Sequence, residues 1–307
     1  MDQRIGSRSS YISDYKIDTI ITTGPPHSLH IIGLQLKEAL GVQWIADFRD
    51  PWTSIGYHKK LKLTKVSQRK HKKLEKQVLT TADKIIVTSN NTKKEFQQLT
   101  EQPITVITNG YDVVKSSVII RDSKFTLSHI GSFLSERNPK ILWEVLQDLR
   151  NEDAGFKLDF ELKLVGAVSD SVLKSIQKYN LTNCLNNIGY VSHNEALKIQ
   201  KETQLLLLVE IDSEETKAII PGKLFEYMVS ERPIVAIGPT RSDVEVILKE
   251  TNTGTYFNYT DSEGLKSVIK TYYPNYKTGD LKTNAIGVPN TVERINKKLA
   301  QSIMGIA

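Results

Sequence analysis

The 307-residue sequence contains one cysteine, Cys184. A single thiol excludes an internal disulfide framework and a cysteine-rich metal site, and such a residue more often packs as a small apolar side chain than acts as a nucleophile. Long apolar runs are also missing, since the longest candidate, Leu205–Val209, suits a buried strand and not a membrane helix of about 18 residues. The first seventeen residues have no apolar signal-peptide core. These absences favour a cytoplasmic location.

Acidic residues are scarce in one stretch, and the net charge of +6 is concentrated there. Between residues 58 and 76, lysines and arginines alternate with leucine and valine, and Glu75 is the only acidic residue. The spacing predicts a basic amphipathic helix over 58–76. Its simplest interpretation is a solvated helix face. An anionic membrane surface is a second. Nucleic-acid binding is a third, although no recognised motif or aromatic platform accompanies the run.

Strand and helix patterns alternate along most of the chain, which is typical of parallel α/β sheets. The predicted strands are 18–23, 43–46, 84–88, 105–108, 125–130, 160–165, 185–191, 205–211, 234–237 and 254–257. The alternation stops near 113–123 and then restarts. The fold class we predict is therefore α/β, with two Rossmann-like doubly wound domains whose ligands lie at the carboxyl ends of the strands.

We assign domain boundaries from the same pattern. A disordered segment is expected at 1–17, a partial first domain at 18–118, a second domain at 119–285 and a helix at 286–307 that packs back toward the first domain.

The most informative stretch is 216–237, which reads as loop, helix and strand. Pro221 and Gly222 suit a helix start, and Lys223 lies in its first turn, an arrangement that can hold a phosphate. Glu226 follows three residues later on the same helix face, where its carboxylate can accept hydrogen bonds from sugar hydroxyls. An ordinary surface Lys–Glu pair is the alternative.

Further candidates follow other predicted strands. Gly131 lets the backbone approach a phosphate, and Arg137 can pair with a diphosphate in bidentate fashion. His27 follows the first strand within a Gly-Pro-Pro-His turn. Arg49 and Asp50 cluster with Asp47 at the end of the second strand, where a mutual ion pair is the alternative to catalysis.

The segment PGKLFEYMVSERPIVAI resembles the donor-binding segment of retaining glycosyltransferases of the GT-B fold. This is the large nucleotide-sugar-dependent family of bacterial polysaccharide and lipopolysaccharide glycosyltransferases, often called family four or group 1. TTGPPHS, IADFRDPW and TNGYD resemble its amino-terminal domain and inter-domain turn. The family pattern has two glutamates separated by seven residues. Glu226 matches the second, whereas Ala218 occupies the position of the first, so that glutamate is absent here.

The resemblance implies roles for individual residues. Glu226 would hold the ribose, and Arg137 and Lys223 the diphosphate. The remaining implied donor-binding residues are Gly131, Ser132, Tyr190, Val191, Pro221 and Gly222, with Tyr190 and Val191 near the nucleobase. His27, Arg49 and Asp50 are the candidates on the acceptor and catalytic side.

The expected function is transfer of a sugar, with retention, from a nucleotide-diphosphate sugar to a polysaccharide or lipid-linked acceptor in cell-envelope or exopolysaccharide biosynthesis. Neither a cofactor nor a metal nor a nucleic acid is expected, and the protein would lie peripherally at the inner face of the cytoplasmic membrane. Relatives have more chain before Asp18, so we expect the acceptor domain to be incomplete. The chain as a whole would then bind donor but transfer poorly. The alternatives are a nucleotide-sugar-binding protein without turnover and a nucleotide-sugar epimerase on the same fold.

Overall fold

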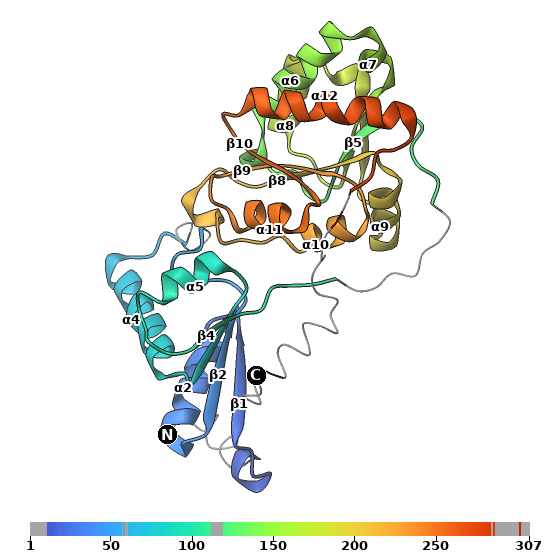
Figure 1. The fold of residues 1–307 in the computed structure, drawn as a ribbon. Helices are drawn as coiled ribbons and strands as arrows, with labels where there is room; N and C mark the ends of the chain where they lie inside the picture. Colours follow the sequence, from blue (N-terminus) through green and yellow to red (C-terminus); the bar gives the residue numbers. More distant parts are fainter. Residues whose placement is uncertain are drawn as a thin grey trace. The chain divides into compact units, whose positions relative to one another are not determined.

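The computed structural model describes residues 11–56, 58, 61–111, 119–283, 285 and 301 (Figure 1). The chain divides into two compact units. The amino-terminal unit consists mainly of the residues up to Asn109, and the carboxy-terminal unit consists of Gly110–Lys217 and Pro221–Thr291. The division therefore falls some nine residues before the predicted boundary at 118.

The amino-terminal unit is built on a four-stranded parallel sheet of order β1-β2-β3-β4. The strands are β1 (Thr19–Gly24), β2 (Gln43–Phe48), β3 (Lys84–Val87) and β4 (Ile104–Val106). The connecting helices are α2 (Ser28–Leu40), α4 (Lys65–Thr81) and α5 (Asn90–Phe96). Parallel neighbouring strands must be joined by crossover connections such as these helices. The alternation of strand and helix patterns in the sequence is therefore what a parallel sheet requires.

The core of this unit lies between the sheet and its helices. Trp44, Phe48 and Phe96 are fully buried there. Helix α2 approaches β2 so closely that a side chain at Gly33 would collide with the indole ring of Trp44. The indole N–H of Trp44 donates to the hydroxyl of Thr22 on β1, at 2.9 Å, so the buried polar group is satisfied.

Two predictions for the amino-terminal unit are wrong. Residues 11–14 are helical and Ile12 packs in a small core with Leu36, so the predicted disorder does not extend over this part of 1–17. The continuous basic helix is interrupted at 61–64, where Lys62 has a φ of 48°, and α4 starts only after its N-cap Thr64. The hydroxyl of Thr64 accepts from the amide of Ser67, which caps the amino-terminal end of α4 and begins the helix there.

The carboxy-terminal unit contains a six-stranded parallel sheet of order β10-β9-β8-β5-β6-β7. The strands are β5 (Phe125–Ile130), β6 (Phe160–Val165), β7 (Leu185–Gly189), β8 (Leu205–Val209), β9 (Ile234–Gly238) and β10 (Gly254–Asn258). The strand order reverses between β5 and β8, which are neighbours in the sheet. In doubly wound folds, ligands bind in the crevice at the carboxyl ends of two such strands.

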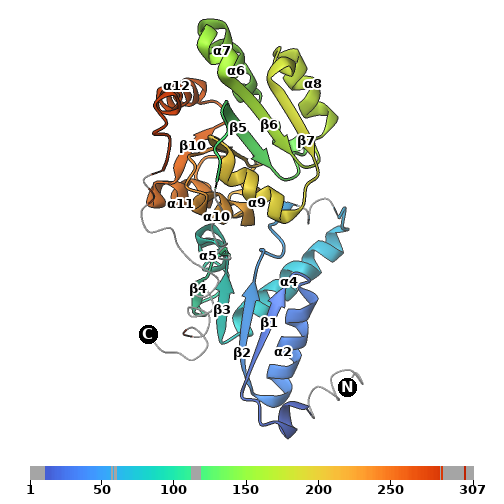
Figure 2. The same cartoon turned by 90° about the vertical axis from the view of Figure 1, so that its right-hand side faces the viewer.

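Helices cover both faces of this sheet (Figures 1 and 2). They are α6 (Lys140–Glu152), α7 (Ala154–Asp159), α8 (Asp170–Lys178), α9 (His193–Glu202), α10 (Gly222–Val229), α11 (Asp243–Thr251) and α12 (Ser262–Thr278). Helices α9, α10 and α11 lie on one face, and α6, α8 and α12 lie on the other. With both faces covered, the strands are buried throughout, as the all-buried pattern of β5, β8 and β9 shows.

Strands β5 and β6 match the predicted bounds residue for residue. Arg137 lies in a short 3-10 turn, Ser135–Arg137, directly before α6. The predicted helix 286–307 falls almost entirely outside the described residues. None of the helices in the described part of the chain is long and apolar enough to cross a membrane.

Candidate functional site

The first helical turn of α10 is fastened to the end of β5. The ammonium group of Lys223 donates to the carbonyl oxygen of Ile130 at 2.8 Å, and the amide of Ile130 donates to the hydroxyl of Tyr227 at 2.9 Å. Tyr227 is fully buried. The backbone at the carboxyl end of β5 is thereby fixed against the amino-terminal end of α10, at the point where the strand order reverses.

Gly131 permits this close approach. Its φ is +114°, and a Cβ atom built on it would lie 2.8 Å from Nζ of Lys223. Gly166, at the end of β6, has a φ of +113°, and its Cβ would lie 2.8 Å from the carbonyl oxygen of Gly131. The two loops therefore pack backbone against backbone, and a side chain at either position would collide with Lys223 or with the backbone of Gly131.

Two cations share this end of the sheet. Burial, with a contribution from the positive charge of Arg137, lowers the pKa of Lys223 to about 8, while Glu226 acts in the opposite direction. The Nε atom of Arg137 is buried and has no hydrogen-bond partner in the described structure. A guanidinium donor without an acceptor, next to a desolvated ammonium group, is suited to bind an anion.

Glu226 is positioned by α9. The amide nitrogen of Gln200 donates to one carboxylate oxygen at 2.9 Å, and the Nε2 atom of His193 lies 4.0 Å from the other. Gln200 is only 2% exposed. The buried amide therefore fixes the orientation of the carboxylate, and the second oxygen keeps its acceptor capacity.

Other predicted donor-side residues occupy loop and cap positions. Pro221 is the N-cap of α10 and Gly222 is its first residue. Ser132 is exposed directly after Gly131. Tyr190 and Val191 come after the end of β7 instead of within it, and the Tyr190 side chain is 92% exposed. Ser192, which follows them, is the N-cap of α9, and its hydroxyl accepts from the amide of Glu195.

Arg49, Asp50 and Asp47 lie together after β2, and the ion pair that was predicted as the alternative is present. A guanidinium nitrogen of Arg49 lies 3.7 Å from the carboxylate of Asp47, and Arg49 also donates to the side-chain oxygen of Asn109. Burial raises the pKa of Asp47 and of Asp50, and Arg49 partly offsets both shifts. Arg49 is therefore occupied within its own unit.

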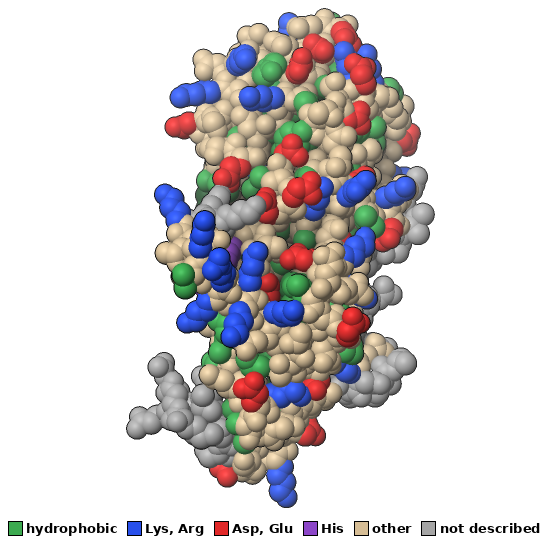
Figure 3. All heavy atoms as spheres, turned by 90° about the vertical axis from the view of Figure 1, so that its left-hand side faces the viewer, with side chains coloured by type: hydrophobic (Ala, Val, Ile, Leu, Met, Phe, Trp, Pro, Cys, Tyr) green, Lys and Arg blue, Asp and Glu red, His purple; other side chains and the backbone are tan. Residues whose placement is uncertain are grey.

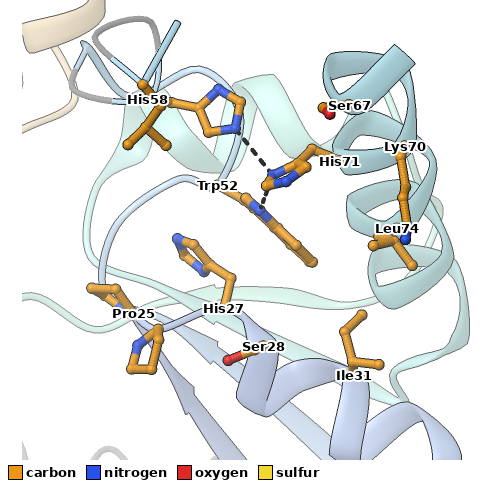
Figure 4. Close-up of a pocket in the computed structure, with 12 residues that line it drawn as sticks. Pro25, His27, Ser28, Ile31, Trp52, His58, Ser67, Lys70, His71 and Leu74 are labelled. Atoms are coloured by element: carbon orange, nitrogen blue, oxygen red, sulfur yellow. Dashed lines mark hydrogen bonds between the residues drawn. The ribbon is translucent and has the colours of Figure 1, made fainter. Parts of the chain in front are cut away.

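His27 lines a pocket of about 650 Å³ in the amino-terminal unit (Figure 4). Its ring is 8% exposed and stacks on Trp52 with a centroid distance of 5.3 Å. Burial, with a contribution from His58, lowers the pKa of His27 to about 4, so the ring is neutral at neutral pH.

The comparisons with known proteins agree on one architecture. Residues 7–115 match the family described as Glycosyltransferase Family 4. Sucrose-phosphate synthase from Thermosynechococcus elongatus is 14% identical, with a TM-score of 0.64 over 99% of this chain and 78% of that chain. Anabaena HepE in complex with UDP is 14% identical, with a TM-score of 0.69 over 98% and 82%. The chain has the GT-B glycosyltransferase fold.

A third GT-B structure, the lipopolysaccharide outer core galactosyltransferase WaaB, is 14% identical with a TM-score of 0.64 over 99% of this chain and 79% of that chain. No curated protein matches the sequence. At these identities the solved structures establish the fold. Together with the family match over the amino-terminal third, they indicate a glycosyltransferase.

Two polar residues of this GT-B chain were not predicted. Gln200 lies seven residues after His193 on α9, two helical turns along the same face, and that spacing was the available signal. Glu210 directly follows the all-apolar strand β8 and is 4% exposed. It accepts hydrogen bonds from Ser242 at 3.0 Å and Tyr256 at 2.7 Å, and burial raises its pKa to about 7. An acidic residue after a buried strand was the signal there.

Proposed function

We propose that the protein transfers a sugar, with retention, from a nucleotide-diphosphate sugar to a saccharide or lipid-linked acceptor. The observation that carries this proposal is the group formed by Gly131, Lys223 and Arg137 at the carboxyl end of β5. A glycine without a side chain beside the ammonium group, the desolvated ammonium group itself and a guanidinium group with a free buried donor are the features that suit a diphosphate.

These cations would act on the leaving group. As the bond between the sugar and the diphosphate breaks, negative charge grows on the diphosphate oxygens, and fixed positive charges stabilise it most in a desolvated site. Lys223 and Arg137 can supply that stabilisation without a metal, so we propose metal-independent transfer. Positive charge from the chain's own residues is the support for this part of the proposal.

The nucleoside would lie along α9 and α10. Glu226 would accept hydrogen bonds from the ribose hydroxyls with the oxygen that Gln200 leaves available. Tyr190 and Val191, at the carboxyl end of the neighbouring strand β7, would lie near the nucleobase. Two of the similar HepE structures hold UDP and UDP-glucose, respectively, which supports a nucleotide-sugar donor for this chain.

Support for the acceptor comes from the amino-terminal unit. We assign His27, Arg49 and Asp50 to the acceptor side. A role in polysaccharide or cell-envelope biosynthesis is supported by the structural similarity to WaaB, a lipopolysaccharide galactosyltransferase. Lys and Arg side chains gather on the face that α4 presents (Figure 3), which supports a peripheral position at the inner face of an anionic membrane.

A donor assay tests the proposal. The purified chain is incubated with radiolabelled nucleotide sugars, first alone and then with lipid-linked and free saccharide acceptors, and the products are separated. Transfer to an acceptor with an unchanged anomeric configuration is expected, and it should be lost in Lys223→Met. An epimerised nucleotide sugar formed without acceptor would favour the epimerase alternative. Donor binding without any product would favour the binding protein without turnover.

A further inference from the structure

The pocket around His27 is lined by three segments of the amino-terminal unit (Figure 4). The turn after β1 and the start of α2 supply one side, the segment around Trp52 and His58 supplies a second, and α4 supplies the third. The apolar wall residues are Pro25, Pro26, Ile31, Trp52, Leu61 and Leu74. A volume of about 650 Å³ with mostly apolar walls is typical of a small-molecule site.

One buried polar group inside this pocket has no partner. Neither ring nitrogen of His27 has a hydrogen-bond partner in the described structure, although the ring is 92% buried. The neutral imidazole carries one N–H donor and one acceptor lone pair. Burying both without partners costs free energy, and a ligand in the pocket would remove that cost.

Positive charge and helix ends surround the same space. On α4, Ser67, Lys70, His71 and Leu74 form one stripe at helical spacing and all four line the pocket. Ser28 is the first residue of α2, and Ser67 lies in the first turn of α4, so the positive ends of two helix dipoles lie at the pocket. None of the described residues that line the pocket is acidic. The charge pattern thus favours an anion and opposes a cation.

Three aromatic side chains hold one wall in place. The indole N–H of Trp52 lies 3.3 Å from Nδ1 of His71, and Nε2 of His58 lies 3.1 Å from the same atom. Because an indole nitrogen can only donate, Nδ1 of His71 must be the acceptor, and His58 must carry its proton on Nε2. The wall therefore has a defined protonation pattern before any ligand enters, which lowers the cost of ordering it on binding.

We propose that this pocket binds a phosphate-bearing amphiphile, the phosphate at His27 and Lys70 and the apolar chain against Pro26, Ile31 and Leu74. This inference rests on the proposed function, because the ligand counts as an acceptor only if the protein is a glycosyltransferase. The ligand would then be the lipid phosphate end of a lipid-linked acceptor. Apolar walls alone would suit any hydrophobic compound. A phosphate on the ligand is favoured by three further features, which are the unpaired imidazole of His27, the ammonium group of Lys70 and the two helix starts.

The test is a calorimetric titration with farnesyl phosphate below its micelle concentration, with farnesol and inorganic phosphate as the two partial ligands. Farnesyl phosphate should bind at least about tenfold more tightly than either partial ligand, because each one occupies only half of the pocket. Equal affinity for farnesol would overturn the phosphate assignment. Equal affinity for inorganic phosphate would overturn the apolar one.

Matched variants place the site. Lys70→Gln and His27→Phe should each weaken farnesyl phosphate binding by about tenfold, the usual loss of one charge-assisted hydrogen bond. Lys72→Gln makes the same charge change on the same helix, away from the pocket lining, and should change affinity less than about twofold. Equal losses in Lys70→Gln and Lys72→Gln would show general attraction to the basic helix and overturn the site.

UDP binding is measured on every preparation, together with thermal unfolding, to separate the two hypotheses. Retained UDP binding without farnesyl phosphate binding would overturn the pocket assignment and leave the proposed donor site intact. Farnesyl phosphate binding that depends on Lys70, without any UDP binding, would support the pocket and contradict the donor site. A variant that unfolds early is replaced by His27→Gln, which keeps a polar side chain at this position.

Discussion

The ammonium group of Lys223 lies 2.8 Å from the carbonyl oxygen of Ile130, and the two residues come from elements 93 positions apart. This contact joins the first turn of α10 to the last residue of β5, at the reversal of the strand order. The same ammonium group lies 3.4 Å from Nε2 of His129, so two of its three donors are used in positioning and the third remains for a ligand. Lys223 therefore belongs to the scaffold and to the proposed diphosphate site at once.

Gly131→Ala should weaken UDP binding by about tenfold or more. The added Cβ would come within 2.8 Å of Nζ of Lys223, at a φ of +114° that disfavours any side chain. Gly279→Ala is the matched control, since its φ of +79° also disfavours a side chain but a Cβ there meets nothing within 4 Å. Titration calorimetry on both variants gives the comparison. Equal affinities for the two variants would remove Gly131 from the site.

Gln200→Leu should weaken UDP binding about tenfold and leave pyrophosphate binding nearly unchanged. The reason is that Gln200 acts through the orientation of Glu226, which is proposed to contact ribose and not phosphate. Arg137→Gln should instead weaken both ligands. Competition of UDP and pyrophosphate for the same site provides the readout. A loss of pyrophosphate affinity in Gln200→Leu would contradict the division between the ribose and diphosphate parts.

Donor binding should take up a proton at pH 8.5 and none at pH 6.5. Because the pKa of free Lys223 is lowered to about 8, the side chain is largely neutral at the higher pH, and the diphosphate favours its charged form. The affinity for UDP-glucose should therefore fall above pH 8, by up to tenfold per pH unit. Calorimetry in two buffers with different ionisation enthalpies measures the proton directly. Proton release, or no proton exchange at pH 8.5, would show that Lys223 is not at the diphosphate.

Vesicle binding should require anionic lipid and should weaken with salt. The exposed face of α4 carries Lys65, Arg69, Lys72 and Lys73, and Val66 on the same helix is 75% exposed. Each basic residue near an anionic surface contributes about 1 kcal/mol, which ions screen. Co-sedimentation with vesicles of neutral and anionic lipid measures the effect. A solvated helix face would bind neither kind, and equal binding to both would point to apolar insertion alone.

Much of the fold could be predicted because its signals are local. Apolar runs of strand length alternate with helical patterns, so β5 and β6 were predicted with correct bounds. Lys223 and Glu226 could be selected because a helix start and a shared helix face are also local features. The break at 61–64 was missed, since the charge pattern continues through it and only the Thr64 N-cap marks the new helix.

The parts that could not be predicted depend on tertiary contacts. Gln200 reaches Glu226 from another helix, 26 residues away in the sequence. The pocket residues His27, His58 and His71 come from three separate segments, and nothing in their spacing brings them together. Glu210 has a raised pKa only because the surrounding elements bury it. Sequence patterns do not report any of these packing relations.

Comparison of UDP with uridine monophosphate by calorimetry on the intact chain tests the central claim most directly. If Arg137 and Lys223 hold a diphosphate, UDP should bind at least about tenfold more tightly than the monophosphate, and this difference should disappear in Arg137→Gln. Equal affinity for the two nucleotides, or a difference that persists in Arg137→Gln, would contradict the account.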